Sequence, residues 1–194
     1  MAQDDGRTKE VTREITHRGP VFAVEKIEFR DPRFGGRRTR RDIVRHPGAV
    51  TIVPVLPDGR IILIRNYRTS VEESLLEFPA GKLDRGEEPC AAAARELEEE
   101  TGYRAGALRP LGSFLTSPGL TDELMHAFLA SDLGHVGQRL QPGEEIVVHQ
   151  FDPEAVREMI SSGAIKDGKT IAAFFLWELL GGQVCPPYGE AVSG

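Results

Sequence analysis

The sequence predicts an α+β fold, an α/β/α sandwich with a mixed sheet, preceded by a small β-rich segment at the N-terminus. Two observations carry this prediction. Short runs of alternating or β-branched apolar residues recur along most of the chain, and such runs are typical of strands. Helical signals are few, and they do not alternate regularly with the strands as they would in the βαβ units of a parallel sheet.

The N-terminal segment, residues 1–46, is expected to consist mainly of strands. Val11–His17 and Val21–Phe29 both carry alternating and β-branched residues. The turn residues Phe34-Gly35-Gly36 precede an arginine-rich stretch that ends at Val44. This stretch is expected to be the returning strand of a hairpin.

A second hairpin is expected around Pro57-Asp58-Gly59, because Asp-Gly readily adopts the positive φ angles of tight turns. Its strands are the flanking apolar runs Ala49–Leu56 and Arg60–Arg65. The elements expected further along the chain are strands at Leu108–Leu115, Leu124–Ala130 and Ile146–Phe151 and helices at Pro153–Ser161 and Lys169–Leu180.

The clearest helix is expected at Glu87–Thr101. Acidic residues occupy its expected first turn, Pro89 lies near its start, and a run of alanines follows. Gly102 is expected to end the helix, since glycine adopts the left-handed conformation common at helix C-termini.

The composition is that of a globular protein that handles small molecules. The chain has 194 residues and a net charge of −6, which argues against a nucleic-acid polymer as partner. No apolar run approaches the roughly 18–20 residues needed to span a bilayer, and the polar N-terminus does not resemble a signal peptide. The two cysteines, Cys90 and Cys185, lack metal-ligand spacing and are expected to be thiols in a reducing compartment, which indicates the cytoplasm.

The end of the expected helix carries a cluster of acids. Residues three and four apart share a helix face, so Glu96, Glu99 and Glu100 converge on one side and Glu98 points to roughly the opposite side. Arg95 can pair with Glu99, but one arginine cannot neutralise three carboxylates. A hard divalent cation can, which predicts Mg²⁺ or Mn²⁺. The alternative interpretation is a solvated glutamate-rich surface helix.

The wider context of this helix resembles the Nudix box at every defined position. The matching residues are Gly81, Glu87, Arg95-Glu96-Leu97, Glu99-Glu100 and Gly102-Tyr103, at the spacing of that motif. In Nudix hydrolases the box forms a loop, a helix and a second loop on an α/β/α sandwich. The resemblance therefore implies that fold and a metal-dependent hydrolase of nucleoside diphosphate derivatives.

The resemblance also implies a role for each position of the motif. Glu96, Glu99 and Glu100 would be the principal metal ligands, with the Ala80 carbonyl as a further ligand. The architectural positions are Gly81, which allows close backbone approach, Glu87 and Arg95, which form an ion pair between loop and helix, and the helix-ending Gly102. Glu98 fills an undefined position of the box and is expected to be dispensable.

A proline downstream of the motif restricts the range of expected substrates. Pro118 lies sixteen residues after Gly102, in Ser117-Pro118-Gly119-Leu120. This is similar to the ADP-ribose pyrophosphatase subgroup, and the implied reaction converts ADP-ribose and water to AMP and ribose 5-phosphate. Two alternatives remain open: hydrolysis of another nucleoside diphosphate sugar such as GDP-mannose, and a Nudix-like sensor without catalysis.

The subgroup takes its general base from a loop, and here Gln141-Pro142-Gly143-Glu144-Glu145-Ile146 matches that loop. The alignment favours Glu144 over Glu145, and either acid could instead simply face solvent. Loop closure would exclude water until the substrate binds.

Further residues are candidates for substrate contacts. Arg68 is the best candidate for the diphosphate, because a guanidinium binds phosphate oxygens in a fork, and Arg40 or Arg41 could act similarly. Each could also be a surface arginine. Phe22 is a candidate for stacking on adenine, with a core phenylalanine as the alternative. Glu77 lies on an apolar strand, where an acid needs a partner, and could bind ribose hydroxyls or pair with an arginine.

These inferences give a domain organisation. Residues 1–46 form a β-rich segment too small to hold a core of its own, and the resemblance implies that it packs against a partner subunit in a homodimer. Residues 47–182 form the catalytic domain, and residues 183–194 form a tail rich in glycine and proline. The expected partner is a small nucleoside diphosphate substrate, with neither nucleic acid nor membrane involved.

Overall fold

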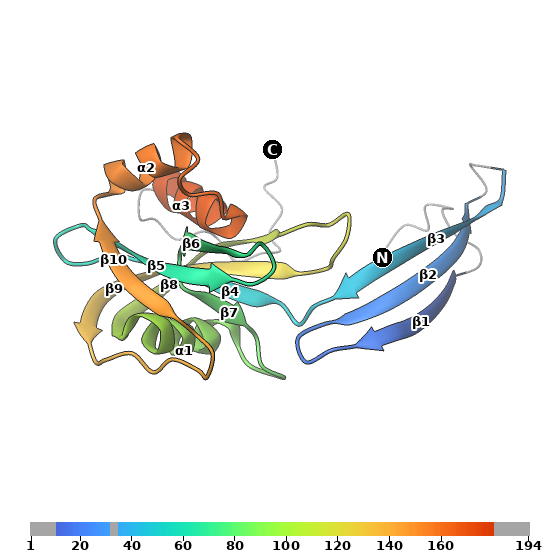
Figure 1. Cartoon of the computed structure of the whole chain (residues 1–194), viewed down its shortest axis with the longest axis horizontal. Helices are drawn as coiled ribbons and strands as arrows, with labels where there is room; N and C mark the ends of the chain where they lie inside the picture. Colours follow the sequence, from blue (N-terminus) through green and yellow to red (C-terminus); the bar gives the residue numbers. More distant parts are fainter. Residues whose placement is uncertain (1–10, 32–34, 181–194) are drawn as a thin grey trace, which may run out of the picture. The chain divides into compact units, whose positions relative to one another are not determined.

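The computed structural model describes residues 11–31 and 35–180 (Figure 1). Phe34 of the expected turn, Cys185 and the expected tail lie outside these described residues. The chain divides into two compact units. One comprises the described residues up to Pro47 together with Leu115–Glu123. The other runs from Gly48 to Phe114 and resumes at Leu124.

The first unit is built on an antiparallel three-stranded sheet, coloured blue in Figure 1. Its strands are β1 (Val11–Arg18), β2 (Ala23–Asp31) and β3 (Arg37–Arg45), paired in the order β1-β2-β3. Cross-strand ion pairs, such as Arg38 of β3 with Glu28 of β2 at 3.0 Å, offset the charge of the arginine-rich strand β3. Strand β2 begins two residues later than predicted, because a turn closed by the Gly19 amide on the Phe22 carbonyl occupies its expected start.

The second unit contains two sheets. One has the order β7-β4-β9-β8 and the other β10-β5-β6. The strands are β4 (Ala49–Pro54), β5 (Ile61–Arg68), β6 (Glu73–Glu77), β7 (Ala80–Lys82), β8 (Tyr103–Leu115), β9 (Leu124–His135) and β10 (Ile146–Phe151). Strand β4 pairs parallel with β9 and antiparallel with β7, so the larger sheet is mixed, as predicted.

Helices cover both faces of this unit. Figure 1 shows α1 (Pro89–Thr101) on one side of the strands and α2 (Pro153–Ser161) and α3 (Gly168–Leu180) on the other. Side chains of β4 alternate between two cores: Val50 and Ile52 pack with Leu97 of α1, whereas Val53 packs in the cluster that contains Phe174 of α3. Because every residue of β4 is buried, this strand forms the centre of the sandwich. The α/β/α architecture predicted from the sequence is therefore confirmed.

Two local differences from the prediction matter for the site. Helix α1 begins at Pro89 rather than Glu87, since Glu88 is extended (φ −73°, ψ 137°), so the acids that were expected in its first turn precede the helix. Strand β7 was not predicted, because it has only three residues, one of them glycine. The end of α1 follows the prediction, with Gly102 in the left-handed conformation at φ 72°. None of the described helices is both long and apolar enough to cross a membrane.

Candidate active site

The site is built where β7 passes beside α1. A Cβ atom placed on Gly81 would lie 2.0 Å from the carboxyl carbon of Glu96, so any other residue here would force the Glu96 carboxylate to move. Glycine at this position therefore lets the β7 backbone touch the Glu96 carboxylate. Leu97, on the neighbouring face of the helix, is fully buried against β4 and fixes the orientation of α1.

Arg95 connects the loop before α1 to the acidic face of the helix. Its Nε and Nη2 donate to the two oxygens of Glu87 at 2.9 and 3.0 Å, and its Nη1 donates to Glu96 at 2.6 Å. Glu87 also accepts a hydrogen bond from the Asp84 amide at 2.9 Å. This hydrogen bonding by Arg95 holds the pKa of Glu87 below its ordinary value. The loop–helix ion pair of the motif is thus present, and Glu99 lies 3.6 Å from the same guanidinium.

Two acids of the cluster, Glu96 and Glu100, are buried, and burial is the largest influence on the pKa of each. Glu100 is 4% exposed and accepts one hydrogen bond from the Ala80 amide at 2.8 Å. Burial raises the pKa of Glu100 to about 8, and the charges of Glu96 and Glu144 act in the same direction. Burial also raises the pKa of Glu96, against the lowering effect of Arg95. Both carboxylates would be stabilised as anions by a cation placed among them.

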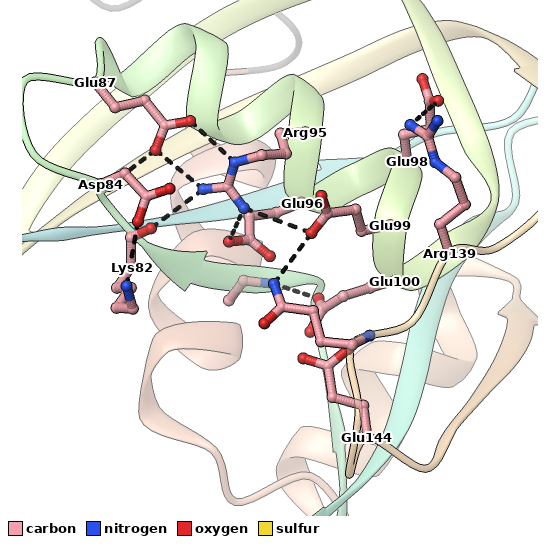
Figure 2. Close-up of polar contacts among 12 residues, drawn as sticks. Lys82, Asp84, Glu87, Arg95, Glu96, Glu98, Glu99, Glu100, Arg139 and Glu144 are labelled. Atoms are coloured by element: carbon pink, nitrogen blue, oxygen red, sulfur yellow. Dashed lines mark hydrogen bonds and ion pairs between the residues drawn. The ribbon is translucent and has the colours of Figure 1, made fainter. Parts of the chain in front are cut away.

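The chemistry of this cluster fits a hard divalent cation. Glu96, Glu99 and Glu100 share one side of α1, whereas Glu98 extends away from them (Figure 2). Among the described residues, no three acidic, histidine or cysteine side chains surround a common centre. Glu96 is bonded to Arg95, and Glu100 is bonded to the Ala80 amide. The candidate metal-ligand atoms are all oxygens, the type of ligand that Mg²⁺ and Mn²⁺ prefer.

The loop before β10 brings a fourth acid to this side of the helix. Glu144 is half-buried and accepts a hydrogen bond from the Gln141 amide at 2.8 Å. The Gln141 side chain donates in turn to Glu99 at 3.3 Å. The Glu144 charge contributes to raising the pKa of both Glu96 and Glu100. Its neighbour Glu145 is exposed, so the geometry favours Glu144 as the acid that acts at the cluster.

A buried ion-pair network lies beside the cluster. Glu77 is fully buried and accepts a fork from Arg68 at 2.8 and 2.5 Å, as well as a hydrogen bond from Lys169. Lys169 also pairs with Asp167 at 2.9 Å. The arginine partner expected for Glu77 is thus present, and Arg68 is close enough to Glu100 that its charge opposes the rise in the pKa of that acid. Lys169 was missed as a partner because it lies 92 residues further along the chain.

The NUDIX domain family model matches residues 45–174, about two-thirds of the chain. The chain belongs to the Nudix family.

Known proteins with similar sequences or structures match most of its length. The chain is similar to the ADP-ribose pyrophosphatase of Bacillus subtilis, with 38% identity over 85% of this chain and 89% of the relative. It is also similar to the methanol dehydrogenase activator of Bacillus methanolicus, with 39% identity over 77% of this chain and 83% of the relative. A solved structure, described as a crystal structure of ADP compounds hydrolase, superimposes with a TM-score of 0.76 at 27% identity, covering 91% and 97% of the two chains.

Three predicted substrate contacts lie in the first unit, outside the part of the Nudix domain that holds the carboxylates. Phe22 precedes β2 and is 42% exposed, so the alternative of a core phenylalanine was wrong. Arg40 pairs with Asp42 at 3.3 Å on β3. Pro118 lies in an exposed turn closed by the Leu120 amide on the Ser117 carbonyl.

Proposed function

We propose that this protein is a metal-dependent hydrolase that cleaves the diphosphate of ADP-ribose to AMP and ribose 5-phosphate. The observation that carries the proposal is the set of Glu96, Glu99 and Glu100 on one face of α1, with Glu144 brought to the same side by a separate loop. The similarity to an ADP-ribose pyrophosphatase over most of both chains supports this substrate.

The residues of the cluster have distinct proposed tasks. Glu96, Glu99 and Glu100, with the Ala80 carbonyl, would hold Mg²⁺, for which Mn²⁺ could substitute. When bound, the ion would neutralise the charge of the diphosphate and lower the pKa of an attacking water. Glu144 is the proposed general base, with Glu145 as the weaker candidate. It would take the proton of the water as the oxygen forms its bond to phosphorus, while the bond from phosphorus to the bridging oxygen breaks.

Arg68 is the proposed diphosphate contact within this unit. Its Nε and Nη2 are held by Glu77, whereas its Nη1 makes no hydrogen bond within the described part of the chain. That Nη1 is therefore a donor available to a phosphate oxygen. Phe22, Arg40 and Pro118 remain proposed contacts to the nucleotide.

The proposal extends to assembly and location. Residues 1–46 would form the dimerisation segment of a homodimer, residues 47–182 the catalytic domain and residues 183–194 a tail, and the protein would act in the cytoplasm. Hydrolysis of GDP-mannose, and ligand sensing without catalysis, are the alternatives that the following experiment separates.

The test compares wild type, Glu99→Gln and Glu158→Gln with ADP-ribose and with GDP-mannose, each in Mg²⁺ and in EDTA. Glu158 is exposed on α2 and serves as the matched control. We expect AMP from ADP-ribose in Mg²⁺ alone, a loss of at least about 100-fold in kcat for Glu99→Gln, and unchanged activity for Glu158→Gln. Preferential cleavage of GDP-mannose would correct the substrate. Binding without any turnover would support a sensor.

A further inference from the structure

The loop that carries Glu144 is docked on the C-terminal end of α1. The last carbonyls of a helix have no partners within the helix. Here the Glu99 carbonyl accepts the Arg139 amide at 3.0 Å, and the Glu100 carbonyl accepts the Gln138 side chain at 2.7 Å. The Gly102 carbonyl accepts the amides of residues 136 and 137 at 2.7 and 3.1 Å. The loop therefore caps the same helix turn that presents two of the proposed metal ligands.

The close fit of this docking is visible at Gly102. A Cβ atom placed there would lie 2.7 Å from the Gln138 nitrogen and 2.8 Å from the Gly137 carbonyl carbon. Gly102 thus has a second task besides the left-handed turn that ends the helix. It lets the backbone of the loop rest directly on the end of α1.

Glu98 supplies a side-chain anchor for the same loop. Its side chain is only 12% exposed, and it accepts the guanidinium groups of Arg104 from β8 and Arg139 from the loop. Figure 2 shows Glu98 and Arg139 meeting on the side of α1 away from Glu96. The helical angle of Glu98 suggested a dispensable residue. In the structure the Glu98 carboxylate binds two arginines, and one of these, Arg139, belongs to the loop.

Arg139 is close in sequence to Glu144, the proposed base, and Gln141 lies between the two. Arg139 precedes Gln141 by two residues, and Gln141 both donates to Glu99 and supplies the amide that Glu144 accepts. We propose that Glu98 and Arg139 are positioning residues, which hold the loop on α1 so that Glu144 faces the carboxylates of the cluster. This inference rests on the proposed function, in which Glu144 acts on the attacking water.

The two arginines of Glu98 provide a matched pair of variants. Arg139→Ala and Arg104→Ala each remove one partner of the same carboxylate, from side chains that are 68% and 66% exposed. Only Arg139 lies on the loop. We expect Arg139→Ala to lower kcat for ADP-ribose about fivefold with KM within about twofold, Arg139→Lys to recover part of the loss, and Arg104→Ala to leave kcat unchanged. The melting temperatures of the two alanine variants should agree.

Hydrogen exchange of the amides at 136–145 gives a readout that does not depend on turnover. We expect faster exchange there in Arg139→Ala than in wild type or Arg104→Ala. Equal effects of the two alanine variants on kcat, or a loosened loop with unchanged kcat, would overturn the positioning role. If wild type cleaves no ADP-ribose, the proposed function fails. Faster exchange in Arg139→Ala alone would then still support the anchoring, and equal exchange in all variants would overturn it.

Discussion

Two buried glutamates of the second unit, Glu77 and Glu100, differ in how their charge is compensated. Glu77 is fully buried and bonded to two cationic side chains, Arg68 and Lys169. Glu100 is 4% exposed, yet the hydrogen bond that it accepts comes from a neutral backbone amide, that of Ala80, and burial raises its pKa to about 8. Side chains of the protein itself, Arg68 and Lys169, therefore compensate the charge of Glu77. Glu100 has no such directly bonded cation among the described residues, and a metal ion at the proposed site would supply the missing charge.

The largest expected effect on stability is that of Glu77→Gln. This change leaves Arg68 without its carboxylate partner and Lys169 with Asp167 alone. Removal of one partner from a buried ion pair costs up to about 3–5 kcal/mol, and the 38% exposure of Arg68 places the loss toward the lower end. Urea unfolding measures the loss. Glu73→Gln on the same strand is the control, because its ion pair with Lys166 is exposed and should contribute less than about 1 kcal/mol. Similar losses for both variants would mean that the buried network has no special role.

The pH dependence of the free energy of unfolding of the metal-free protein tests the burial of Glu100. Between pH 4.5 and 8 the unfolded chain has lost the Glu100 proton, whereas the folded chain keeps it because its pKa is raised. The folded state then binds more protons, so the free energy of unfolding falls as pH rises, by up to about 1.4 kcal/mol per pH unit. Denaturant titrations in EDTA should show this slope in wild type and a shallower slope in Glu100→Gln. Equal slopes would contradict the uncompensated burial of Glu100.

The contrast also shows which parts were predictable from the sequence. The strands around Asp58-Gly59, the helix ending at Gly102 and the shared face of three glutamates all follow from local spacing. The pairing of Glu77 with Lys169 was not predictable, because it joins residues 92 positions apart. The position of Glu98 on the helix predicts which side it faces, but it does not predict that Arg139 lies on that side.

Strand β7 was missed for a related reason. Its three residues have no measurable periodicity, and they form a strand because β4 pairs with them in the folded unit. Gly81 was recognised from its place in the motif alone. The contact that explains a glycine here, the Glu96 carboxylate against the β7 backbone, forms only when α1 packs on the sheet.

The most direct test of the account is proton release on metal binding. Calorimetric titration with Mg²⁺ at pH 7, in two buffers of different ionisation enthalpy, measures the number of protons displaced. We predict that wild type releases up to about one proton per bound ion, because Mg²⁺ displaces the proton retained by Glu100, and that Glu100→Gln binds more weakly without this release. Binding without proton release in wild type, or equal release in Glu100→Gln, would contradict the claim that a bound metal ion compensates the charge of Glu100.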